Sequence, residues 1–252
     1  MGRFRNAAGT VPRPGAAANR VGVVSTPSLP GPQGAQPPAP PSGSWFRLAS
    51  AGLLFLLTVL VFVDLARDVV TTGALPYDRS VMLWLHVRES PGVTTTMSAV
   101  TELGGVVAVP IIAVAWAGLL WWRGRRRDAA LLAAAVIGST LLNAVLKAVF
   151  QRDRPDFWEH LVVEDSYSFP SGHAMASMSL AAALVVIAWS SRWRWPAIAL
   201  ATVYVLVVGV SRLYLGVHFP SDVLAGWCVA VAWVVVVAVV LDRGERSRTG
   251  LR

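Results

Sequence analysis

Long apolar stretches alternate with short polar connectors through most of the chain, from residue 45 to residue 242. The six stretches cover residues 45–63, 93–122, 129–150, 172–189, 196–210 and 222–241. About 20 helical residues cross a hydrocarbon core of roughly 30 Å. We therefore predict an all-α, polytopic membrane bundle of six transmembrane helices. Pro110 is expected to kink the long second helix, and loop residues are expected to complete the short fifth one.

Residues 1–44 differ sharply from the rest of the chain. They contain nine of the 16 prolines and a single aromatic residue, Phe4. Such a segment buries too little apolar surface to offset the entropy of ordering, so we expect a disordered Pro/Gly/Ala-rich N-terminal arm. Its basic start is followed by Pro and Gly rather than by an apolar run, which argues against a signal peptide. The membrane domain is expected at 45–242, and a basic cytoplasmic tail at 243–252.

The composition narrows the class of protein. Only 14% of the residues are charged and 55% are hydrophobic, whereas about a quarter of an ordinary soluble domain is charged. A disordered regulator and a coiled coil are thereby excluded. The single cysteine, Cys228, excludes an internal disulfide scaffold. The net charge of +8 would suggest nucleic-acid binding in a soluble protein, so the placement of charge decides its meaning.

Basic residues concentrate on one side of the predicted topology. Fifteen of the 22 lysines and arginines lie in the N-terminal arm with Arg47, in residues 123–127 and 192–194, and in the tail. Eleven of the 14 carboxylates lie on the opposite side. Because Lys and Arg flanking short loops are retained in the cytoplasm, we predict cytoplasmic termini in a plasma-membrane protein. Topology then accounts for the net charge, and no nucleic-acid partner is expected.

Two of the extracytoplasmic connectors combine cations, histidines and hydroxyls beside membrane helices. Residues 147–177 read KAVFQRDRPDFWEHLVVEDSYSFPSGHAMAS, and residues 211–222 read SRLYLGVHFPSD. Charged groups at helix ends next to lipid are costly to desolvate, which makes them functional candidates. Snorkelling to the interface would account for Lys147 or Arg154 alone, but it does not explain the histidines.

The chemistry of a phosphate ester fits these residues. Its hydrolysis needs cations for the non-bridging oxygens, a nucleophile in line with the leaving oxygen, and an acid that protonates that oxygen. Arg154 and Arg212 each supply a planar fork for two oxygens, and Lys147 supplies a point charge. For each arginine, the alternative is a structural ion pair with Asp153, Asp156 or Asp222.

The tetrapeptide at 170–173, PSGH, precedes an apolar helix. Ser171 suits an N-cap and Gly172 lets the backbone approach a ligand, so the free amides of the helix start would face a phosphate. A cap is the alternative role of Ser171, and the two roles are compatible. Asn143 either positions the lysine four residues later or forms a hydrogen bond between helices. Glu102 contacts either the site or the membrane interface.

His218 and Asp222 are four residues apart, and Pro220 and Ser221 mark a turn between them into the last apolar stretch. A carboxylate at this spacing can hold one imidazole nitrogen protonated and direct the other toward phosphorus. A core or zinc-binding histidine pair is the alternative. Zinc is disfavoured because three cations would crowd the pocket and neither a cysteine nor a third suitable ligand is nearby. We expect no metal and no cofactor.

With these motifs the chain resembles the type 2 phosphatidic acid phosphatase family, also called the lipid phosphate phosphatase and haloperoxidase superfamily, in its bacterial membrane type. Residues 147–155 match K-x6-R-P, residues 170–173 read PSGH, and residues 211–222 match S-R-x5-H-x3-D. The motifs follow the family's order, separated by 14 and 37 residues. The resemblance implies that His218 is a nucleophile that forms a phosphohistidine. It also implies that His173 protonates the leaving lipid oxygen and later activates water.

The implied activity is hydrolysis of phosphate monoester or pyrophosphate groups on lipids. Candidate substrates are phosphatidic acid, phosphatidylglycerol phosphate and polyprenyl pyrophosphates such as undecaprenyl pyrophosphate. Three alternatives stay open: a lipid phosphotransferase with the same site, a vanadate-dependent haloperoxidase, and a non-enzymatic transporter or lipid-binding protein. Haloperoxidases are typically soluble, which six spans oppose, and a non-enzymatic role would leave the motifs vestigial. The motifs do not identify the lipid, and the oligomeric state is unknown.

Overall fold

The computed structural model describes residues 43–158, 161–162 and 166–249. The arm expected at 1–44 lies outside this range except for residues 43 and 44, which begin the first helix. The described residues form helices and connecting loops without a strand, as the all-α prediction requires. The helices are α1 (Gly43–Thr72), α2 (Pro76–His86), α3 (Pro91–Glu102), α4 (Ala108–Trp122), α5 (Arg126–Phe150), α6 (Gly172–Ala188), α7 (Arg194–Tyr214) and α8 (Pro220–Thr249).

Four of the described helices are long and apolar enough to cross a membrane. They cover Trp45–Thr72, Arg126–Phe150, Arg194–Tyr214 and Pro220–Arg243. Two further apolar helices, α4 and α6, contain 15 and 17 residues. The polytopic helical bundle is therefore confirmed. The count of six spans stays a prediction, because it requires both shorter helices to cross as well.

The stretch at 93–122 does not form one kinked helix, and that prediction is wrong. The chain leaves the helical path after Glu102 and resumes it at Ala108, which separates α3 from α4. Pro110 lies in the first turn of α4, where its missing N–H breaks no intrahelical hydrogen bond. Gly104 lies in the break, and a Cβ there would be 2.4 Å from Cγ1 of Val208 on α7. The break is therefore packed closely against α7.

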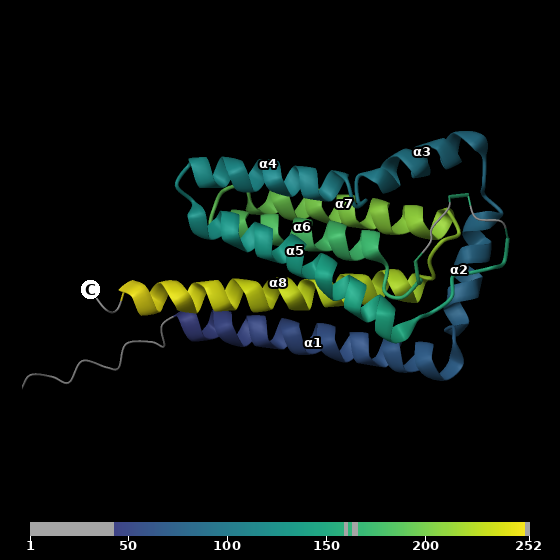
Figure 1. Ribbon diagram of the computed structural model, residues 1–252, viewed down its shortest axis with the longest axis horizontal. Coiled ribbons are helices and arrows are strands. Elements are labelled where there is room, and N and C mark those ends of the chain that lie inside the picture. The colour runs from purple at the N-terminus through teal and green to yellow at the C-terminus, as the bar shows by residue number, and fades with distance from the viewer. Residues whose placement is uncertain (1–42, 159–160, 163–165, 250–252) are drawn as a thin grey trace, which may run out of the picture. The chain divides into compact units, whose positions relative to one another are not determined.

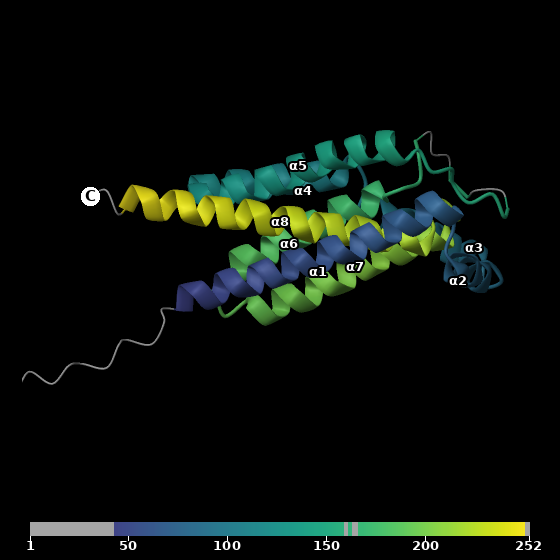
Figure 2. The same ribbon diagram turned by 90° about the horizontal axis from the view of Figure 1, so that it is seen from below.

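Helices α1 and α4–α8 run along one common direction, whereas α2 and α3 lie at one end of them (Figures 1 and 2). Helix α8 packs against α1, α5 and α6, while α6 also contacts α7. Small residues allow close approach between these helices. A Cβ at Gly138 of α5 would lie 2.2 Å from the ring of Trp233 on α8. Because lipid provides little hydrophobic driving force, such close packing is a main source of association between membrane helices.

The first helix is the least enclosed of the long ones, and most of its apolar side chains are exposed. Near its end, however, Leu65, Ala66 and Val69 are buried with Phe169 and Ala225. Phe62 stacks on Phe169 with ring centroids 5.9 Å apart. The end of α1 therefore supports the loop that leads into α6.

The three motif segments meet at one end of the bundle. The ends of α5 and α7 and the starts of α6 and α8 lie there, on the side of α2 and α3 (Figures 1 and 2). The start of α1 and the end of α8 lie at the opposite end (Figure 1). The described part of the chain thus begins and finishes away from the motifs. Which end faces the cytoplasm stays a prediction based on charge.

Candidate active site

A cavity of about 960 Å³ opens at the end of the bundle where the three motifs meet. Five of the eight predicted site residues line it: Lys147, Arg154, Gly172, His173 and His218. The other three, Ser171, Arg212 and Asp222, are at most 1% exposed. The structure therefore gathers all three motifs around one cavity, although they span 76 residues of the chain.

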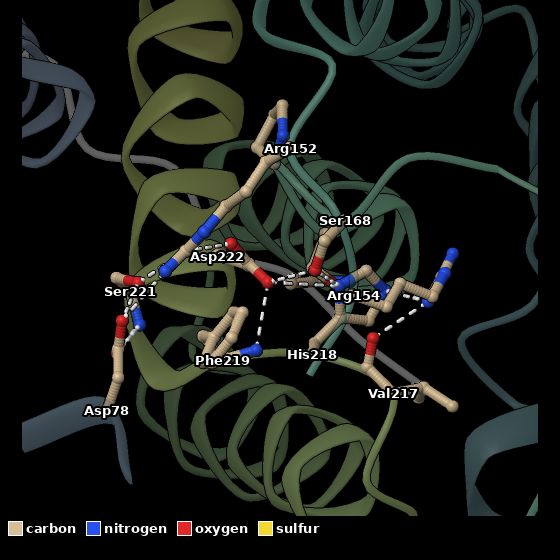
Figure 3. A network of polar contacts seen from close by, with 12 residues as sticks. Asp78, Arg152, Arg154, Ser168, Val217, His218, Phe219, Ser221 and Asp222 are labelled. Atoms are coloured by element: carbon tan, nitrogen blue, oxygen red, sulfur yellow. Dashed lines mark hydrogen bonds and ion pairs between the residues drawn. The ribbon is translucent and has the colours of Figure 1, made fainter. Parts of the chain in front are cut away.

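The His218 imidazole lies between a carboxylate and a guanidinium (Figure 3). Its Nδ1 atom is 3.4 Å from Oδ2 of Asp222, and its Nε2 atom is 3.4 Å from Nη1 of Arg154. The same Asp222 oxygen accepts hydrogen bonds from the backbone N–H of Phe219 at 2.8 Å and from the hydroxyl of Ser168. Nδ1 is thereby directed toward the buried carboxylate, and Nε2 toward the phosphate-binding cation expected at Arg154.

Two cations of the first motif share one hydroxyl. Lys147 donates to Oγ of Ser166 at 2.7 Å, and Nη2 of Arg154 donates to the same atom at 3.2 Å. Arg154 is held further by Nε to the Ser166 carbonyl and by Nη1 to the Val217 carbonyl, both at 2.8 Å. Ser166 belongs to no motif, so sequence reasoning missed its role in bringing the two cations together.

Arg212 approaches the site from the end of α7 and is 1% exposed. Its Nη1 atom donates to Oγ1 of Thr101 at 2.9 Å. Thr101 lies in the last turn of α3 and is itself buried. The short helix ahead of the break therefore orients a cation of the third motif, and no sequence signal linked these two residues.

The start of α6 is enclosed by its neighbours. Ser171 is confirmed as the N-cap, since its hydroxyl accepts from the backbone N–H of Ala174 at 3.5 Å. A Cβ at Gly172 would lie 3.1 Å from Oδ1 of Asn143 on α5, and one at Gly226 of α8 would lie 2.9 Å from the Ser171 carbonyl. Asn143 donates to the Pro170 carbonyl just before α6 and to Sδ of Met175 within α6, both at 3.1 Å, so it forms a hydrogen bond between helices. Gly172 and Gly226 therefore allow α5 and α8 to pack closely against the backbone of the PSGH motif.

His173 faces the break between α3 and α4. A Cβ at Gly105 would lie 3.4 Å from its Nε2 atom and 3.7 Å from Oε2 of Glu102. Gly105 also lines the cavity. The backbone of the break thus forms the wall beside His173, and Glu102 lies near the site rather than only at the interface.

Sequence reasoning also missed two polar residues beneath His218. Ser168 lies two residues before the PSGH motif, and its hydroxyl is 3.4 Å from Nδ1 of His218. Arg152 is buried and forms an ion pair with Asp222, the carboxylate that was offered as an alternative partner for Arg154 and Arg212. Only the folded chain reveals these contacts, because both residues come from the loop between α5 and α6.

No group of three or more His, Cys, Asp and Glu side chains arranged to hold a metal ion occurs among the described residues. The expectation that no metal is needed concerns the reaction itself and stays a prediction.

The fold and the site are those of a known protein family. The sequence model of the PAP2 superfamily matches residues 128–246 of this chain, which contain every residue of the three motifs. The chain belongs to the PAP2 superfamily, as the motifs predicted, and it is a multi-pass membrane protein.

Particular relatives agree with this assignment. Phosphatidylglycerophosphatase B of Bacillus subtilis is 35% identical over 177 residues, which cover 67% of this chain and 85% of the relative. Undecaprenyl-diphosphatase of Sulfolobus acidocaldarius is 30% identical over 141 residues, or 54% of this chain and 64% of the relative. The crystal structure of the first transmembrane PAP2 type phosphatidylglycerolphosphate phosphatase from Bacillus subtilis superposes with a TM-score of 0.68. It is 30% identical, and the match covers 75% of this chain and 96% of that one.

Proposed function

We propose that this protein is an integral membrane phosphatase that hydrolyses phosphate monoester or pyrophosphate groups of lipids. Phosphatidic acid, phosphatidylglycerol phosphate and polyprenyl pyrophosphates are the substrate candidates. The observation that carries the proposal is the composition of the cavity wall. Lys147 and Arg154 lie at its polar part, and apolar residues from three helices continue it: Val109 and Pro110 of α4, Val136 and Ala144 of α5, and Ala176 of α6.

A lipid phosphate matches such a cavity in both of its parts. Its headgroup carries negative charge, which a guanidinium and an ammonium group neutralise. Its chains are apolar, and they gain by contact with apolar side chains along the helices. A water-soluble phosphate ester would need only the first part. The relatives named above, which act on a phosphatidylglycerophosphate and an undecaprenyl diphosphate by their names, support a lipid substrate here.

The proposed first step transfers the phosphoryl group to the protein. The lone pair of Nε2 of His218 attacks phosphorus, and the bond from phosphorus to the leaving oxygen breaks with its electron pair on that oxygen. His173 donates a proton to the same oxygen. Asp222 stabilises the positive charge that develops on the His218 ring, because its carboxylate faces Nδ1. The products of this step are the dephosphorylated lipid and a phosphohistidine.

The proposed second step restores the enzyme. His173, now neutral, takes a proton from a water molecule while the water oxygen attacks phosphorus. The phosphorus–nitrogen bond breaks, and its electron pair returns to Nε2 of His218. Inorganic phosphate leaves, and both histidines regain their starting protonation states. Lys147, Arg154 and Arg212 neutralise the phosphoryl oxygens in both steps, while Gly172 presents its backbone N–H at the start of α6. The backbone N–H of Ser171 donates to the Asp222 carbonyl at 3.0 Å, so Ser171 acts by capping this helix start.

Activity is expected to survive chelation, because three protein cations take the part that magnesium plays in other phosphoryl transfers. Purified protein in detergent would be assayed for phosphate release from each candidate lipid, with and without excess EDTA. Vanadate is expected to inhibit all of this release, since it imitates the phosphoryl group in transfer. Loss of activity on chelation that a divalent metal restores would contradict the mechanism. Absence of vanadate-sensitive release from every lipid would contradict the proposed function.

The site is proposed to face the extracytoplasmic side of the plasma membrane. With Cys228 replaced by alanine, a cysteine at the exposed Asp156 in the loop after α5 is expected to react with an impermeant maleimide in intact cells. A cysteine at Arg123, at the other end of the bundle, is expected to react only after the membrane is opened. The labelled protein is then measured on a denaturing gel, and labelling of the same cysteine with a membrane-permeant maleimide serves as the loading control. The reverse labelling pattern would invert the topology.

A further inference from the structure

Beneath His218 the structure contains a chain of buried charges that reaches into α2. Arg152 is 7% exposed, and Asp78 and Asp222 are fully buried. Nη1 of Arg152 donates to Oδ1 of Asp222 at 2.5 Å, and its Nη2 donates to Oδ2 of Asp78 at 3.0 Å. One guanidinium thus joins two carboxylates from helices that are far apart in the sequence (Figure 3).

Asp78 also holds the start of α8. Its Oδ1 atom accepts from the backbone N–H of Ser221 at 2.9 Å, and its Oδ2 atom accepts from the hydroxyl of Ser221 at 2.6 Å. Ser221 in turn accepts from Nη1 of Arg152 at 2.8 Å. An unsatisfied N–H at a helix start is stabilised by such an acceptor. Asp78 therefore caps α8 one residue before Asp222, although it lies outside the residues that match the family model.

The two carboxylate oxygens of Asp222 have different partners. Oδ1 is bound by Arg152, while Oδ2 accepts from Phe219 and Ser168 and faces Nδ1 of His218. The ring of Phe219 also lies 4.0 Å from the Arg152 guanidinium carbon, which fixes the position of that group. Rotation of the carboxylate would break the bond to Arg152. Oδ2 is therefore kept toward His218.

We propose that Asp78 and Arg152 are positioning residues for phosphoryl transfer, which act by fixing the orientation and charge of Asp222 behind His218. The inference rests on the proposed function and adds to it a residue from α2. Because Asp78 shares the guanidinium, the positive charge of Arg152 does not fall on Asp222 alone. Asp222 keeps enough negative character to stabilise the His218 ring as the phosphorus–nitrogen bond forms.

The test compares four variants with the wild-type full-length protein in detergent. Asp78→Asn keeps the shape of the side chain and removes its charge. Arg152→Lys keeps the charge and removes the fork that bridges two carboxylates. The double variant joins both changes. Asp64→Asn is the matched control, because Asp64 is an exposed carboxylate of α1. Nitrophenyl phosphate is the substrate, so that lipid binding does not enter the rates, and thermal melting reports the folded fraction.

Each single variant is expected to lose on the order of 10- to 100-fold in kcat per folded site, the range typical of residues that orient a reactive group. KM and the inhibition constant of inorganic phosphate, a ground-state ligand, are expected to stay within about 3-fold of wild type, because uniform binding is unchanged. Inhibition by vanadate is expected to weaken together with kcat, because vanadate imitates the phosphoryl group in transfer. The double variant is expected to resemble a single one, since the two residues act through one contact to Asp222. Asp64→Asn is expected to behave as wild type.

Three results would overturn the inference. The first is an Asp78→Asn variant that turns over like Asp64→Asn. The second is a parallel loss of activity and of inorganic phosphate binding that follows the unfolded fraction. The third is failure of both single variants to fold. The last two results would mean that the ion pairs stabilise the fold rather than position Asp222 for catalysis. A wild-type protein that hydrolyses neither nitrophenyl phosphate nor any candidate lipid is a separate outcome, which would reject the proposed function and this inference with it.

Discussion

Replacement of His218 by alanine is expected to abolish release of the leaving group from every phosphate substrate. The covalent step then has no nucleophile, and removal of the nucleophile in comparable enzymes costs about 10⁶ in kcat. His218 is buried just before α8 and lines the cavity, and its Nε2 atom lies 3.4 Å from Nη1 of Arg154. Nitrophenol release from nitrophenyl phosphate, followed in the first second after mixing, measures this step directly, because it does not wait for hydrolysis of the intermediate.

His86→Ala is the matched control for His218→Ala. His86 stacks on Trp158 at the end of α2, with ring centroids 4.1 Å apart, and does not line the cavity. Its loss is expected to leave turnover close to wild type. If His218→Ala releases nitrophenol at the wild-type rate, His218 is not the nucleophile and the proposed first step fails.

Replacement of His173 by alanine is expected to separate the two steps. A lipid alkoxide leaves poorly without a proton, so turnover of lipid substrates should fall by on the order of 10² to 10⁴, the usual contribution of a general acid. Nitrophenolate needs little such help. With nitrophenyl phosphate, this variant should show a rapid burst of about one nitrophenol per site and then slow turnover, because water is no longer activated.

The stoichiometry of the burst distinguishes the roles of the two histidines. Acid quenching at the end of the burst, followed by detection of acid-labile phosphate on the protein, reports the phosphohistidine. A burst in His218→Ala together with none in His173→Ala would mean that the acid and the nucleophile are reversed. Wild-type kinetics in both variants would place the reaction elsewhere in the chain.

The apolar pattern predicted both ends of α5, α6 and α7 and the start of α8 to within a few residues. The end of α8, at Thr249, lies beyond the predicted stretch. These helices are apolar over so many consecutive residues that the length of the apolar stretch alone marks them. The pattern failed between residues 93 and 122. There the chain leaves the helix because Gly104 and Gly105 must pass close to α7 and His173. Hydropathy does not register such a requirement, since glycine adds little to it in either direction.

The motifs predicted five of the residues that line the cavity, and they did so without any knowledge of the fold. The motifs can be found from the sequence because phosphate chemistry requires particular side chains at fixed spacing. The helix ends then place these side chains on one side of the bundle. Ser166, Ser168 and Arg152 were missed for the opposite reason. Each acts through a neighbour that comes from another segment, and a serine or an arginine in a polar loop is common.

The amino-acid sequence was enough to predict a helical membrane bundle with a candidate phosphate-binding site, because apolar length and the identity of reactive side chains are local properties of the chain. How the side chains of this candidate site are held in place depends on the packing of the folded chain. Three features join segments up to 111 residues apart: the pairing of Asp78 with Arg152, the contact of Thr101 with Arg212 and the hydroxyl of Ser166 that Lys147 and Arg154 share. Such contacts depend on which helices pack together. The contacts of Arg152 with Asp78 and of Arg212 with Thr101 are also buried, and burial away from water strengthens them.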